Sequence, residues 1–177
     1  MPSYYTYLMS SLPYLVFNSR PPFSLEDFLN TCLYSVSKAD LIRVKEAVTD
    51  FDYQASLKDT PLLKEWHCFN LALRNELVRA RSARMKADPL KYLRNDAHFS
   101  TAIRHIAMAA YRTQNILEAE KLLDLERWRF LDEASAMHHF DIDSLIAYAL
   151  KLKILIRWDK VYNANSESVL QGALGRN

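Results

Sequence analysis

Glycine is almost absent from this chain: its 177 residues contain only Gly172 and Gly175, both near the C-terminus. A phosphate-binding loop, a two-residue hairpin turn and a nucleophile elbow all use glycine, because each needs a positive φ or a close backbone approach. None of these can be built in its usual form before Gln171. The sequence therefore predicts helices joined by short polar breaks, and we expect an all-α fold, a bundle of about six helices with an extended aromatic N-terminal arm.

The composition supports a packed core, since half of the residues are apolar and 12% are aromatic. At this length we expect a single helical domain over residues 1–162, followed by a mobile tail at 163–177. Within it we predict an aromatic arm (1–23), a helical hairpin (24–51) and a long-helix bundle (60–162). Leu12 before Pro13 favours extended backbone in the arm, where a short strand is an open alternative.

Helix starts can be recognised from capping residues. Ser24 with Asp27 forms a capping pair before a helix over about 25–35, with Phe23 placed to pack against Phe28. Ser37 with Asp40 begins a second helix, which should run to about residue 51. Three further helix starts are predicted: Thr60–Pro61 for a helix over about 61–87, Asn115 for 116–136 and Asp141 for 141–162. The spacing of apolar residues predicts one more helix, over 96–113.

Charge is unevenly distributed along the chain. Between residues 74 and 112, nine basic residues face only three acidic ones, whereas between 118 and 143, eight acidic residues face three basic ones. The last turns of a long helix favour cations, which accounts for some of these arginines but not for Arg74 or Arg104. A nucleic-acid interface is not expected, because the net charge is only +2 and no binding motif is present.

His138, His139, Asp141 and Asp143 form the densest group of potential metal ligands. Adjacent histidines in one helical turn point in different directions, and Asp141 already serves as a helix cap. A metal-dependent hydrolase built on His138, His139 and Asp143 is therefore an alternative rather than the main hypothesis, and we expect no metal and no cofactor. Cys32 and Cys68 are expected to be buried thiols in a reducing compartment.

No segment approaches the roughly 20 consecutive apolar residues of a membrane span. Residues 1–19 carry no charged side chain, but they lack the basic start and continuous apolar core of a signal peptide. We expect a cytoplasmic protein that is at most peripheral at the inner face of the cell membrane and is not inserted into it.

Three stretches carry a resemblance to a known family. They are the aromatic start (Tyr5, Tyr7, Leu8, Ser11–Pro13 and Pro22–Ser24), Leu73–Glu76 with the arginines that follow, and Leu131–Glu133 with Phe140, Asp141, Tyr148–Lys153, Arg157 and Trp158. The chain resembles a small uncharacterised bacterial family encoded among the subunits of V/A-type (vacuolar/archaeal-like) ATPases. It is more distantly similar to the helical C-type subunit of those enzymes, also called the d subunit, although it is much shorter and shows no threefold repeat.

The resemblance implies a non-catalytic accessory or central-stalk subunit of a V/A-type proton- or sodium-translocating ATPase, which couples or holds other subunits as the d subunit does. Its partners would be other ATPase subunits, including the central stalk and the membrane ring. A general cytoplasmic helical adaptor is the alternative. The residues expected to contact partners are a basic face (Arg74, Arg79, Arg81, Arg84), an acidic face (Glu118, Glu120, Asp132, Glu133) and aromatic anchors (Tyr5, Tyr7, Trp158).

Overall fold

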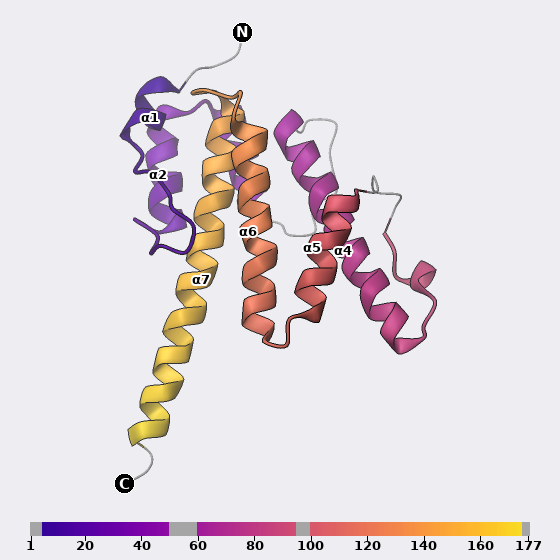
Figure 1. Ribbon diagram of the computed structural model, residues 1–177. Helices are drawn as coiled ribbons and strands as arrows, with labels where there is room; N and C mark the ends of the chain where they lie inside the picture. The colour runs from indigo at the N-terminus through magenta and orange to yellow at the C-terminus, as the bar shows by residue number, and fades with distance from the viewer. Residues whose placement is uncertain (1–4, 50–59, 95–99, 175–177) are drawn as a thin grey trace. The chain divides into compact units, whose positions relative to one another are not determined.

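The computed structural model describes residues 5–49, 60–94 and 100–174, with side chains through residue 164 (Figure 1). These ranges contain seven α-helices, a 3₁₀ turn and no strand, which confirms the all-α prediction. The elements are α1 (Thr6–Ser11), α2 (Leu25–Ser35), α3 (Lys38–Thr49), α4 (Pro61–Met85), η1 (Pro89–Lys91), α5 (Thr101–Arg112), α6 (Ile116–Ser135) and α7 (Ile142–Leu174). No helix within the described ranges is both long and apolar enough to cross a bilayer.

The predicted helix caps are confirmed. The Ser24 hydroxyl accepts a hydrogen bond from the Asp27 backbone N–H at 3.1 Å, and the Phe23 and Phe28 rings stack with their centroids 6.3 Å apart. The other four caps act in the same way: Ser37 on Asp40, Thr60 on Leu63, Asn115 on Leu117 and Asp141 on Ser144. The helix starts are therefore set by short-range hydrogen bonds that satisfy backbone N–H groups with no partner inside the helix.

The chain divides into two compact units. The first comprises Met1–Phe51 and His138–Asn177, and so contains α1, α2, α3 and α7. Both α2 and α3 pack against α7 and against each other. Phe28 of α2 and Val44 of α3 are fully buried, and the Phe28 ring stacks on Tyr148 of α7 with a centroid distance of 5.5 Å.

The N-terminal arm packs against other parts of this unit. The Tyr148 hydroxyl donates to the Pro13 carbonyl at 3.0 Å, and the Tyr162 hydroxyl donates to Asn18 at the same distance. The strand left open for this segment is not formed within its described residues, which hold helix α1 instead. The β propensity of its tyrosines is a weak preference, and tertiary contacts such as the burial of Leu8 override it.

The second unit comprises Asp52–Met137 and contains α4, η1, α5 and α6, each of the three α-helices packing on the other two. Its core is built from Leu73 of α4, Ala107 and Ala110 of α5, and Leu123 of α6. The two alanines on α5 allow the backbones of neighbouring helices to approach closely. Partly buried side chains surround this core: Phe69, Leu77, Ile103, Ile106, Ala119 and Leu122.

Two predicted boundaries differ from the structure. Helix α7 continues to Leu174, so its expected end near Tyr162 is wrong, and the expected tail at 163–177 is helical as far as Leu174. The reason is that residues 163–171 contain neither proline nor glycine, so nothing local interrupts a helix already formed. The grouping also differs, because α7 belongs to the unit of the N-terminal helices rather than to one bundle over 60–162.

Other residues take the place of glycine where the described backbone needs a positive φ. These are Asn18 (66°), Lys86 (52°) and Phe140 (62°). Lys86 is the left-handed residue that ends α4, a position where glycine is preferred because a Cβ atom adds strain. Turns that would ordinarily use glycine are therefore built from other residues, at a local cost in backbone strain.

Candidate functional site

A cleft of about 530 Å³ lies between α4 and α5 in the second unit. Its volume falls within the range of ligand-sized pockets. The lining comes from the C-terminal half of α4 and from three residues of α5: Glu76, Arg79, Ala80, Ala83, Arg84, Arg104, Met108 and Tyr111.

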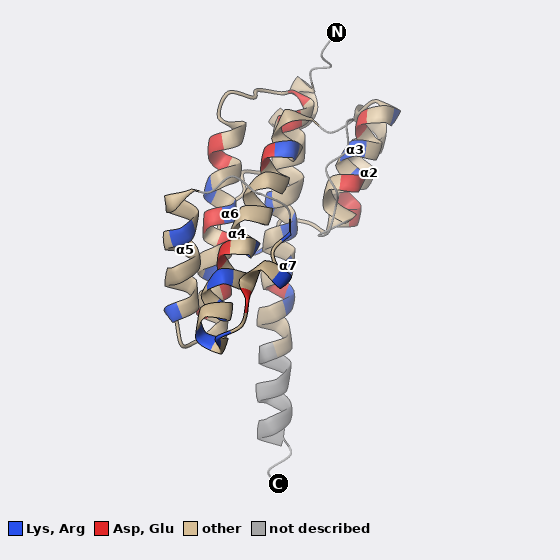
Figure 2. Cartoon of the chain, turned by 90° about the vertical axis from the view of Figure 1, so that its right-hand side faces the viewer, with Lys and Arg blue, Asp and Glu red and all other residues tan. Residues whose placement is uncertain are grey.

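Three arginines and one carboxylate give this cleft a positive character. Arg79 Nη1 lies 2.7 Å from Glu76 Oε1, so the buried carboxylate is already paired within one turn of α4. Arg84 and Arg104 are exposed, and no carboxylate among the described residues pairs with either of them. Helix α5 itself carries no acidic residue, and Figure 2 shows its basic positions as blue bands without red. A guanidinium group binds a carboxylate or phosphate through paired N–H donors, so the cleft is suited to an anionic group.

The rest of the lining is small or adaptable. Ala80 and Ala83 leave space beside the α4 backbone, while Met108 and Tyr111 supply half-buried apolar surface from α5. A methionine side chain can adjust to irregular shapes, and a tyrosine combines apolar area with a hydroxyl. The core formed by Leu73, Ala107 and Ala110 joins the same two helices and therefore fixes the cleft walls relative to each other.

The four arginines of the predicted basic face all lie on α4, but only two of them line the cleft. Arg79 and Arg84 line the cleft, whereas Arg74 and Arg81 do not. Arg104, which helix-end electrostatics left unexplained, joins them from α5. No local pattern in the sequence pointed to Glu76, Met108 or Tyr111, because their convergence depends on how two helices cross.

The predicted acidic face lies along α6 and contributes nothing to the cleft. Glu118, Asp132 and Glu133 are exposed, and Glu120 is half-buried. Elsewhere on α6, Arg127 lies 2.7 Å from the buried Asp124 and donates to Asn70 of α4 at 3.0 Å. That pair joins α6 to α4, so part of the acidic run has a structural role inside the unit.

Two of the three predicted aromatic anchors are buried. Tyr5 donates to Asp40 Oδ2 at 2.6 Å, and Trp158 lies beside the Tyr162 ring. Tyr7, by contrast, is 87% exposed.

In the histidine cluster, Asp141 caps α7 and also contacts His138. His138 Nδ1 lies 2.7 Å from Asp141 Oδ2, while His139 is exposed. Burial by itself would raise the pKa of the Asp141 carboxyl, but the Ser144 backbone N–H and His138 outweigh it, so this pKa lies below its usual 3.8. Among the described residues, no three His, Cys, Asp or Glu side chains are placed to hold one metal ion.

Only one of the two cysteines is buried as expected. Cys32 is fully buried, and its burial raises the pKa of the thiol to about 11, which keeps it protonated and unreactive at neutral pH. Cys68 is exposed on α4, so the prediction that both thiols are buried is wrong for this residue.

Residues 102–172 match the model of the DUF2764 family, which is described as a protein of unknown function. The match covers nearly all of α5, all of α6 and most of α7, and therefore includes the α5 wall of the cleft. No curated protein and no solved structure matches this chain. The family description carries no link to an ATPase.

Proposed function

We propose that this protein is a non-catalytic accessory or central-stalk subunit of a V/A-type proton- or sodium-translocating ATPase, acting in the role of the d subunit. The structural observation that carries the proposal is the cleft between α4 and α5, whose Arg84 and Arg104 are paired with no carboxylate in the described chain. The assignment to this ATPase class rests on the sequence resemblance described above. The work proposed is binding, with the cleft receiving an acidic segment of a neighbouring subunit.

The chemistry of the lining suits such a contact. An acidic side chain of the partner would meet Arg84 and Arg104, and its apolar neighbours would meet Met108 and Tyr111. Arginine and tyrosine are among the residue types that most often dominate the energy of protein interfaces. Arg79 would contribute less, because Glu76 already neutralises it.

The test uses the full-length protein, carrying an affinity tag, purified from its native cells. The double variant Arg84→Glu/Arg104→Glu should lower co-purification of the ATPase subunits at least about tenfold, because it places two like charges against the partner's acidic groups. The matched control is Arg81→Glu/Arg112→Glu, which reverses two exposed arginines on the same helices that do not line the cleft.

Each outcome decides between the alternatives. Loss in the cleft variant with retention in the control supports the proposal. If the wild-type protein captures no ATPase subunit, the ATPase assignment is overturned, and reproducible capture of an unrelated partner would favour the helical adaptor. If ATPase subunits are captured equally by both double variants, the cleft is not the contact.

A further inference from the structure

The segment that follows α4 exposes large apolar side chains among basic ones. We call residues 84–94 the basic tip; it contains the end of α4 and the η1 turn. Met85, Leu90 and Tyr92 are 76%, 75% and 62% exposed. The same eleven residues include four basic side chains (Arg84, Lys86, Lys91 and Arg94) and one acidic side chain, Asp88. Exposed apolar groups of this size, clustered within one short segment, are unusual on a surface that has no contact to make.

This exposure belongs to an ordered structure. Buried Asn75 of α4 holds the far end of the tip through two hydrogen bonds, donating to the Arg94 carbonyl at 2.9 Å and accepting from the Arg94 N–H at 3.1 Å. At the near end, the Ala87 N–H donates to the Ser82 carbonyl at 3.0 Å. Asp88 caps η1 by accepting from the Leu90 N–H at 3.0 Å. The chain thus fixes a loop whose η1 turn buries no residue of its own.

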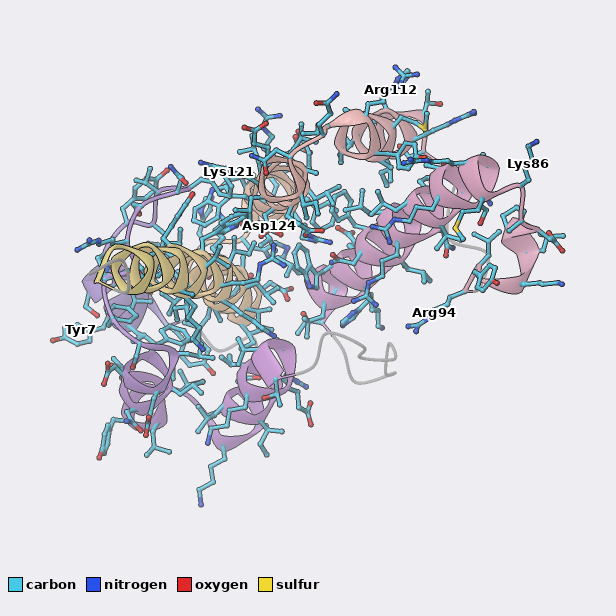
Figure 3. All side chains as sticks on the ribbon, turned by 90° about the horizontal axis from the view of Figure 1, so that it is seen from below. Tyr7, Lys86, Arg94, Arg112, Lys121 and Asp124 are labelled. Atoms are coloured by element: carbon cyan, nitrogen blue, oxygen red, sulfur yellow. The ribbon has the colours of Figure 1, made fainter. Side chains whose placement is uncertain are left out.

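The charges flank the apolar side chains. Figure 3 shows the Lys86 and Arg94 side chains on either side of the η1 turn, both extending away from the ribbon. The one carboxylate of the tip, Asp88, is engaged in the cap. The tip therefore exposes large apolar side chains and basic side chains within one short segment.

We propose that the basic tip binds the surface of an anionic lipid bilayer, with Leu90, Tyr92 and Met85 entering the interfacial region while Lys86 and Lys91 remain at the level of the phosphate groups. Long basic side chains can bury their stems and keep their charged ends in water, and tyrosine favours the membrane interface. Lipid headgroups supply negative charge around an apolar interior, which is the complement of this arrangement.

A protein partner fits these observations less well. Lysine is depleted from protein interfaces, and the tip holds two lysines among its four cations. This inference does not depend on the ATPase assignment, because pure lipid is the ligand.

The experiment is flotation of the full-length protein with vesicles of phosphatidylcholine, with and without phosphatidylglycerol. Wild-type protein should bind the anionic vesicles and bind pure phosphatidylcholine at least about tenfold more weakly, and salt at roughly 1 M should reduce the anionic binding strongly. Lys86→Glu/Lys91→Glu should lower the partition coefficient by roughly 30-fold or more, since two attractive charges become repulsive. Leu90→Ser/Tyr92→Ser should lower it by about tenfold at unchanged net charge.

Two control variants carry the same chemical changes on exposed residues of the first unit. Lys38→Glu/Lys45→Glu reverses two lysines of α3, and Leu33→Ser/Tyr34→Ser removes an exposed leucine and tyrosine of α2. Each should retain binding within about threefold of the wild type, apart from a small general charge effect.

The proposal is overturned if the wild-type protein fails to float with anionic vesicles at low salt, or if the tip variants bind as the controls do. Loss of a co-purifying protein in the tip variants, without any vesicle binding by the wild type, would identify the tip as a protein contact and would equally overturn the lipid proposal. Vesicle binding with no captured ATPase subunit would leave this inference standing and remove the proposed function.

Discussion

Charged side chains are used differently in the two compact units. In the first unit, Asp40 accepts hydrogen bonds from Tyr5, Ser37 and Arg43 at 2.6, 3.0 and 2.7 Å, and the Lys153 ammonium group donates to the Val48 carbonyl. In the second, the buried Asp124 pairs internally with Arg127, but the face between α4 and α5 leaves cations in solvent. The first unit uses polar groups to fix helices to one another, and the second keeps part of its charge available for a ligand.

The comparison separates groups that stabilise the fold from groups that can bind. A buried carboxylate with several donors is costly to remove, because its donors lose their partner in a place that water does not reach. An exposed arginine contributes little to the free energy of unfolding, so a cleft lined by arginines is not explained by stability. The position of these charges therefore favours a binding role for the second unit.

The largest effect on stability is expected from Phe28→Ala in the first unit. Phe28 is completely buried and stacks on both Phe23 and Tyr148, so its truncation should lower the free energy of unfolding by about 3–5 kcal/mol in urea denaturation. Tyr34→Ala on the same helix, at 88% exposure, should change it by less than about 0.5 kcal/mol.

Hydrogen exchange should show where the Phe28→Ala effect falls. Amides of α2, α3 and α7 should lose protection first, because their helices pack together in the first unit, while α4, α5 and α6 have a separate core around Leu73. Equal loss of protection in both units would show that they unfold as one and would remove the basis of the comparison.

A smaller loss is expected from Asp40→Ala. Removing this carboxylate takes away the acceptor of the Tyr5 hydroxyl and the ion pair of Arg43, and should cost about 2–3 kcal/mol. Glu126→Ala in the second unit breaks an ion pair with the exposed Arg129 and should cost no more than about 0.5 kcal/mol. Chemical denaturation of both variants measures the contrast, and similar losses would mean that burial does not distinguish the two pairs.

Features that depend on contacts between residues close in sequence could be predicted, whereas features that depend on distant residues could not. The five helix caps and the Phe23–Phe28 contact were predictable, because each joins residues within five positions of one another. Helix α1 and the burial of Tyr5 were missed, since the Tyr5 hydroxyl bonds to a residue 35 positions away. The cleft was not predicted, although the sequence analysis named two of its lining residues, Arg79 and Arg84, as partner contacts. The excess of arginine on α4 is a local signal, whereas its meeting with Arg104 and Tyr111 depends on the crossing of two helices.

The smallest predicted effect is a gain in stability. Lys86→Gly replaces a side chain held at a φ of 52° with the residue that best tolerates this conformation, so the free energy of unfolding should rise by about 0.5–1 kcal/mol. Asn18→Gly is the control, because asparagine already tolerates positive φ and should gain less. Thermal or urea denaturation measures both, and a loss of stability in Lys86→Gly would show that packing of the lysine stem at the end of α4 exceeds its strain.

The Lys86→Gly variant should change stability and lipid binding in opposite directions. Because Lys86 belongs to the basic tip, Lys86→Gly should weaken binding to anionic vesicles by roughly fivefold while it stabilises the fold. Asn18→Gly should leave vesicle binding unchanged, since Asn18 lies in the first unit and carries no charge. A more stable protein that binds lipid less well would mean that a strained lysine is kept at this position for its charge. If vesicle binding were unaffected, Lys86 would contribute nothing to it, and binding by the tip would depend on Lys91 and its apolar neighbours.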